Sequence, residues 1–111
     1  MPSAEVRVEH CYPEASDFVR RHGPQALAVL HDLLARTEER DGVLVVQASS
    51  RDVAERLGCL SKDTVHRRLR QLCRAGILEP TDPPRRMFTA TTYVVHLAGC
   101  GISLTRSRPA I

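Results

Sequence analysis

One stretch near the middle of the chain constrains the fold most, because it predicts two capped helices joined by a tight turn. Ser49 or Ser50 can cap the first helix, since a serine side chain accepts a hydrogen bond from an unpaired N–H at a helix start. Gly58 can end this helix, because glycine adopts the left-handed conformation at little cost. A second helix is expected over residues 61–75, with a serine cap at its start. The sequence therefore predicts a helix-turn-helix.

The second of these helices separates apolar from charged residues when its positions are spaced at 100°. The inner side holds Val65, Leu69, Leu72 and Cys73. The outer side holds Asp63, Arg67, Arg70 and Arg74, and His66 and Gln71 flank it. Residues 62–74 carry five Lys or Arg and one Asp, a local charge of +4, whereas the whole chain of 111 residues nets +3. All other residues together therefore sum to −1, and the positive charge is concentrated on this helix.

This charge pattern favours DNA as the partner. An α-helix fits the major groove of B-DNA, where arginine can bind guanine, aspartate can accept from cytosine and threonine can contact thymine. Residues near the helix start are expected to reach bases, and later arginines to meet phosphates, which supply affinity without sequence information. The start of the preceding helix offers N–H groups to a phosphate. The predicted DNA-binding residues of the two helices are Ser50, Arg51, Lys62, Asp63, Thr64, His66, Arg67, Arg70, Gln71 and Arg74.

Shorter elements are predicted on both sides of the two helices. Residues 38–42 read as a polar turn, and the β-branched run that follows over residues 43–47 reads as a strand. After the second helix, residues 77–80 are extended, and Pro80 keeps this segment short or at a sheet edge. A stiff, basic loop then leads to a strand over residues 88–97. The extended segment 77–80 and the strand 88–97 together predict a β-hairpin with Arg85 and Arg86 at its tip.

The N-terminal part predicts a helix over residues 24–37 whose apolar residues span an arc of about 160°, wider than a one-sided stripe. This helix is either the centre of the domain or a contact with a second subunit, and the two roles are compatible. Residues 1–22 predict an extension with a short strand around Val6 and Val8 and a short helix. Residues 98–111 predict a loosely held tail, although Ile102 and Leu104 are able to dock.

Two runs of residues resemble a known superfamily. Ala54 and Gly58, followed by residues 60–69, resemble the helix-turn-helix signature of bacterial transcription regulators, although the turn 58–61 is one residue longer than the tightest form. Residues 69–78 resemble the winged-helix members of that group. The resemblance implies an α+β winged helix-turn-helix over residues 23–97, with a three-helix core, a short strand and a C-terminal β-hairpin wing. It also implies that Arg85 and Arg86 meet the minor groove or flanking phosphates. MarR-like and ArsR-like repressors and winged domains of plasmid replication or partition proteins all fit.

Several other classes are disfavoured by the sequence. The length predicts one domain. There is no glycine-rich phosphate loop or nucleophile elbow, so we expect no enzyme and no cofactor. The four cysteines form no C-x-x-C pair, which argues against a zinc site, although His10, Cys11 and Cys100 leave a metal or thiol sensor as a minor alternative. No signal peptide and no membrane span are recognised, and we expect a cytoplasmic protein with free thiols.

These patterns together predict a transcriptional regulator, most simply a repressor, that binds double-stranded DNA in a sequence-specific way. A homodimer is expected, because one recognition helix covers few base pairs. Its interface is expected on the helix 24–37 together with the two terminal segments. The main alternative is a winged-helix module for protein contact, in which the arginines form only a solvated face.

Overall fold

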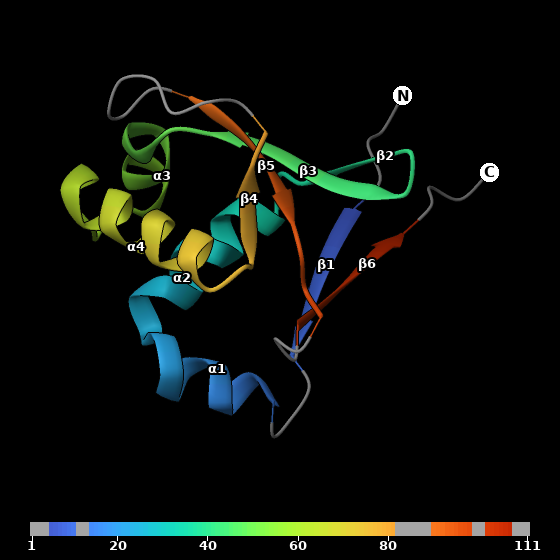
Figure 1. The fold of residues 1–111 in the computed structure, drawn as a ribbon, viewed down its shortest axis with the longest axis horizontal. Helices are drawn as coiled ribbons and strands as arrows, with labels where there is room; N and C mark the ends of the chain where they lie inside the picture. The colour runs from blue at the N-terminus through green and yellow to red at the C-terminus, as the bar shows by residue number, and fades with distance from the viewer. Residues whose placement is uncertain (1–4, 11–13, 82–89, 99–101, 108–111) are drawn as a thin grey trace.

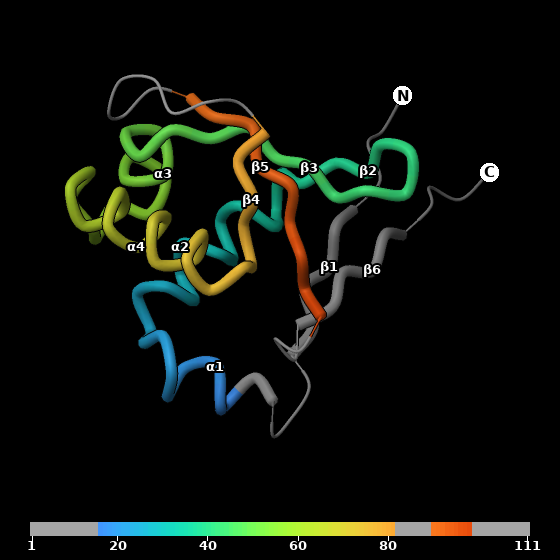
Figure 2. Tube along the Cα trace, viewed as in Figure 1, coloured from blue at the N-terminus to red at the C-terminus, as the bar shows by residue number. Residues whose placement is uncertain are grey.

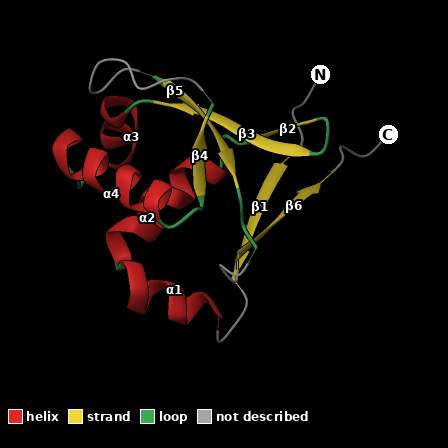
Figure 3. Cartoon of the chain, in the orientation of Figure 1, coloured by secondary structure: helices red, strands yellow, loops and turns green. Residues whose placement is uncertain are grey.

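The computed structural model describes residues 5–10, 14–81, 90–98 and 102–107, which form an α+β fold (Figure 1). The helices are α1 (Glu14–His22), α2 (Pro24–Leu34), α3 (Ser50–Leu57) and α4 (Lys62–Arg74). The strands are β1 (Glu5–His10), β2 (Glu38–Arg40), β3 (Val43–Ala48), β4 (Leu78–Pro80), β5 (Thr91–Val95) and β6 (Ile102–Ser107). In the described part, β2, β3, β5 and β4 form one antiparallel sheet in that order, and β1 and β6 form a separate two-stranded ribbon (Figure 3).

The caps and the turn of the two central helices form as predicted. The Ser49 hydroxyl accepts a hydrogen bond from the backbone N–H of Asp52 at 3.1 Å. Gly58 ends α3 with φ of 71°, in the left-handed region. The Ser61 hydroxyl accepts from the backbone N–H of Thr64 at 3.2 Å at the start of α4. These local signals therefore predicted both helices correctly.

Helix α2 is the centre of the domain. Its fully buried residues are Ala26, Val29, Leu30, Leu33 and Leu34. The helix contacts α1, α3, α4, β1 and β3, so its wide apolar arc is covered within one chain. Of the two roles predicted for this helix, the structural centre is confirmed, and the contact with a second subunit stays a prediction. The helix ends at Leu34, before the predicted end at Thr37. Thr37 is itself buried, and its hydroxyl donates to the Leu33 carbonyl at 2.9 Å.

The predicted strand and hairpin are present in the four-stranded sheet. Strand β5 pairs with β3 on one side and with β4 on the other. Alternate residues of the sheet, including Val46, Leu78 and Val95, are buried in the same core as the helices. The tip of the hairpin, with Arg85 and Arg86, lies outside the described residues. The hairpin prediction is therefore confirmed for its two strands.

The prediction of a polar turn over residues 38–42 was wrong in part, because Glu38–Arg40 forms strand β2 against β3. Only Asp41 and Gly42 turn, and both have positive φ, of 52° and 78°. A two-residue Asp-Gly loop of this kind joins adjacent antiparallel strands. Strand β2 is fully exposed, which is why no alternation of apolar residues marked it.

The prediction of a loosely held tail was wrong for residues 102–107, which form β6. This strand pairs antiparallel with β1 along its whole length, from Glu5 opposite Ser107 to His10 opposite Ile102. The predicted strand and helix of the N-terminal extension are confirmed as β1 and α1. None of the described helices is both long and apolar enough to cross a membrane.

Candidate nucleic-acid interface

Helix α4 presents its charged side to solvent. Val65, Leu69 and Leu72 are buried against the core. The exposed residues on the opposite side are Asp63, Arg67, Arg70 and Arg74, and Lys62 is exposed at the helix start. We call these five the α4 outer face. The two-sidedness predicted for this helix is therefore confirmed, and three of its arginines share one surface.

The start of α4 is fixed by a small network of hydroxyl groups. The Ser61 hydroxyl, which caps the helix, lies 3.0 Å from the Thr64 hydroxyl. The Arg67 guanidinium donates through Nη2 to the Thr64 hydroxyl at 3.4 Å. This hydrogen bond orients the Arg67 side chain over the first turn of α4, and the Arg67 side chain stays exposed. This arrangement holds a fork of N–H donors over the first turn of α4.

Helix α3 lies behind α4 and is fastened to α2 by an ionic network that the sequence patterns did not reveal. The Asp32 carboxylate, on α2, accepts from Arg56 Nε of α3 at 3.0 Å and 3.1 Å. The same carboxylate accepts from Arg36 Nη2 at 3.1 Å, and Arg36 Nη1 donates to the Gln47 carbonyl of β3 at 3.3 Å. The Asp32 side chain is only 11% exposed. The network therefore sets the position of α3 relative to both α2 and the sheet.

Two predicted DNA-binding residues serve packing. Ser50 is buried at 3% exposure, so its side chain is covered in the described structure, whereas its neighbour Arg51 is exposed. Gln71 Nε2 donates to the His22 carbonyl at 2.9 Å, and Gln71 Oε1 accepts from Arg68 Nη1 at 2.9 Å. Both polar ends of Gln71 are thus occupied within the chain. Their contacts with DNA stay predictions, and the flanking position predicted for Gln71 agrees with its half-buried side chain.

The remaining predicted residues divide into three groups. Thr64 and His66 are half-buried at the border of the α4 outer face. Arg51 is exposed in the first turn of α3. Arg85 and Arg86 lie outside the described residues. The structure therefore brings six exposed residues to the two helices of the motif and leaves the hairpin tip undescribed.

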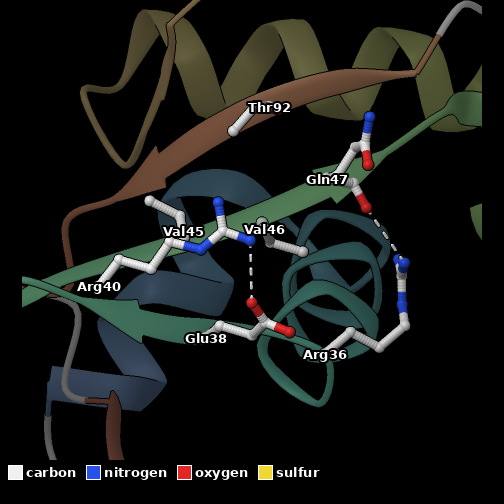
Figure 4. Close-up of a pocket in the computed structure, with 7 residues that line it drawn as sticks. All are labelled: Arg36, Glu38, Arg40, Val45, Val46, Gln47 and Thr92. Carbon is white, nitrogen blue, oxygen red and sulfur yellow. Dashed lines mark hydrogen bonds and ion pairs between the residues drawn. The ribbon is translucent and has the colours of Figure 1, made fainter.

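A hollow of about 270 Å³ lies elsewhere, at the edge of the sheet formed by β2, β3 and β5 (Figure 4). Its walls are Arg36, Glu38, Arg40, Val45, Val46, Gln47 and Thr92. The charged groups in it already have partners, because Arg40 Nη2 pairs with Glu38 at 3.1 Å and Arg36 binds the Gln47 carbonyl. Among the described residues, these charged groups therefore have partners inside the chain, although Arg36 Nε is buried without a hydrogen-bond partner.

Two of the cysteines fall among the described residues. Cys59 is exposed in the turn between α3 and α4, and Cys73 is half-buried on α4. Burial raises the pKa of the Cys73 thiol. Burial also raises the pKa of the Tyr93 hydroxyl, and the negative charge of a Cys73 thiolate raises it further, against a hydrogen bond from Thr91 that lowers it. In the described ranges, no three His, Cys, Asp or Glu side chains gather as metal ligands would.

Comparisons of the chain with protein-family models, curated proteins and solved structures gave no match.

Proposed function

We propose that this protein binds double-stranded DNA through the α4 outer face, as a winged helix-turn-helix regulator of transcription. The observation that carries the proposal is the separation of the two sides of α4. One side is buried in the core, the opposite side exposes three arginines and Asp63, and Lys62 is exposed at the helix start, in a chain that is otherwise slightly acidic. Phosphates along a DNA backbone attract such a surface, and the helix itself fits the major groove.

The arrangement of the surrounding elements supports this proposal. Apart from the additional short strand β2 between α2 and β3, the order α2, β3, α3, α4, β4, β5 is the order of helix, strand, helix, helix, strand, strand expected for a winged helix. Strands β4 and β5 form the hairpin that directly follows α4. Such a hairpin would contact DNA beside the groove that α4 enters. We infer that β4 and β5 are the base of the wing.

The exposed arginines of α4 are expected to differ in role. Arg67, near the start of the helix, is proposed to read a base, and Arg70 to contact a phosphate. Arg67→Ala should therefore weaken binding to a selected site more than binding to random duplex. Arg70→Ala should weaken both and lower the slope of log affinity against log salt by about 1. Arg40→Ala is the matched control, because Arg40 is exposed on β2, far from α4 (Figure 1).

The experiment begins with selection of bound sequences from random duplex DNA and continues with fluorescence anisotropy over a salt series. The proposal is supported if both α4 variants bind more weakly and the Arg40 variant binds as the wild type does. The absence of any duplex binding by the wild type at low salt would overturn it and favour a protein-contact module. Equal losses in all three variants would show that only net charge matters and would also contradict the proposed face.

A homodimer is part of the proposal, because one recognition helix reads only a few base pairs. The interface predicted on residues 24–37 and the two terminal segments would use those residues of α2 that the core leaves open. Sedimentation equilibrium at micromolar concentration, with and without the selected DNA, tests this part. A monomer under both conditions would contradict the dimer and leave DNA binding itself standing.

A further inference from the structure

The basic surface does not end at the border of α4. The last turn of α1 contains Arg20, Arg21 and His22. The His22 carbonyl accepts a hydrogen bond from Gln71 Nε2 at 2.9 Å, which fastens the end of α1 to the flank of α4. On α4, position 71 neighbours positions 67 and 74 at the spacing that brings side chains together on a helix. The last turn of α1 is therefore held beside the arginines of the α4 outer face.

The views of the fold agree with this placement. Helix α1 runs beneath α4, and its C-terminal end turns toward the side of the molecule where α4 begins (Figure 2). Phe18, one turn earlier, is buried in the core, and its ring centroid lies 4.8 Å from that of His22. The orientation of α1 is thus fixed by an apolar anchor and by a hydrogen bond to α4. A helix held in this way is a rigid extension of the motif.

The two arginines of this turn are available to a partner. The Arg20 side chain is 78% exposed and lies 3.5 Å from Asp17, which is itself 50% exposed. An ion pair so open to water is weak and exchanges easily for another anion. Arg21 is exposed as well, and no ion pair to it is found in the part of the chain that the structure describes. Phosphate oxygens are the natural ligands for such a pair of guanidinium groups.

We propose that Arg20 and Arg21 of α1 contact the phosphate backbone beside the groove entered by α4, so that the N-terminal extension lengthens the DNA footprint. This inference rests on the proposed function. Gln71 is then a positioning residue, because it holds α1 against α4. The contacts would add affinity and register without adding base specificity.

A local explanation for the same arginines is that cations at a helix C-terminus offset its partial negative charge. That role would change the stability of α1 but not the response of DNA binding to salt. The salt dependence of binding therefore separates the two explanations. Each phosphate contact contributes about 0.9 to the slope, which corresponds to about an eightfold change in affinity over one decade of salt.

The test measures DNA affinity by anisotropy from 0.05 to 0.5 M salt, for the wild type, Arg21→Gln and the double variant Arg20→Gln, Arg21→Gln. Arg40→Gln, which removes one exposed positive charge from β2, is the control. Random duplexes of increasing length give a second readout, since a longer footprint needs a longer duplex for full affinity. Thermal unfolding of each variant shows that α1 stays folded.

We expect Arg21→Gln to lower the slope by about 1 and the double variant by up to about 2, with the same loss on selected and random DNA. Arg40→Gln should leave the slope unchanged. Unchanged slopes in the α1 variants, with DNA binding by the wild type intact, would overturn this inference and leave the proposed function standing. Failure of the wild type to bind DNA would overturn both.

Discussion

Asp32 offers a stringent test of how α3 is held against the rest of the domain. Asp32→Asn removes the negative charge and places an N–H₂ group where the carboxylate accepts from two guanidinium groups. A hydrogen bond to a charged group contributes about 1.5–3 kcal/mol when its partners are buried. Arg36 and Arg56 are 31% and 37% exposed, so water can replace part of each contact. We therefore take about 1 kcal/mol for each arginine, and about 2 kcal/mol in total.

The measurement is the free energy of unfolding from urea denaturation, together with the melting temperature. A loss of about 2 kcal/mol corresponds to a fall of roughly 8 °C for a domain of this size. The control is Glu38→Gln, which breaks the Glu38–Arg40 pair, because both of those side chains are more than two thirds exposed. Its expected cost is below about 0.5 kcal/mol.

A loss of unfolding free energy in Asp32→Asn no larger than that in the Glu38→Gln control would contradict a stabilising role of the Asp32 network. A double-mutant cycle with Arg56→Gln sharpens the test, because it isolates the coupling between the two side chains. We expect a coupling of about 1 kcal/mol. A coupling near zero would mean that Asp32 does not hold α3 through Arg56.

Three further predictions concern the turns and the buried ionisable groups. Ser61→Ala should lower the free energy of unfolding in urea by about 1 kcal/mol, since the Ser61 hydroxyl caps α4 by accepting from the Thr64 N–H. An unchanged denaturation midpoint would contradict the cap. Gly58→Ala should lower the free energy of unfolding by about 1–2 kcal/mol, because φ of 71° strains any residue with a Cβ even in open space. Gly58→Asn should cost less, and equal stability of the wild type and both variants would argue against a left-handed Gly58. Stability should fall as pH rises above about 9, because the pKa values of Cys73 and Tyr93 are raised in the folded state, so the unfolded chain loses these protons first. Denaturation at pH 8 and pH 10.5 measures the fall, and a Cys73→Ala variant with an equally steep fall would contradict the role of Cys73.

The helices that were predicted correctly are those marked by local sequence signals. Serine caps, a glycine turn and the apolar spacing of α4 each act within a few residues. The exposed side of α4 could be read from the sequence for the same reason, because a helix of fixed period puts Arg67, Arg70 and Arg74 on one side once Val65 is buried. Gln71 lies at the border of this side, where the helical period allows either solvent or a neighbouring element as its partner. Only the packing of α1 decides between solvent and the His22 carbonyl.

The errors outside the site have related causes. Strand β2 carries only charged residues, so its pairing with β3 left no apolar pattern, and the Asp41-Gly42 turn was the one signal that pointed to it. The wide apolar arc of α2 was compatible with two partners, a second subunit or other elements of the same chain. The structure answers this for Leu30, Leu33 and Leu34, which are fully buried without a partner chain.

Two capped helices joined at Gly58, with the positive charge on one side of the second, were predictable from the amino-acid sequence. Those properties follow from backbone geometry and helical period, which need no distant contact. The pairing of β6 with β1, the contact of Asp32 with α3 and the contact of Gln71 with α1 became visible in the folded structure. Each of these joins residues at least 24 positions apart, and such partners are chosen by the packing of the whole chain.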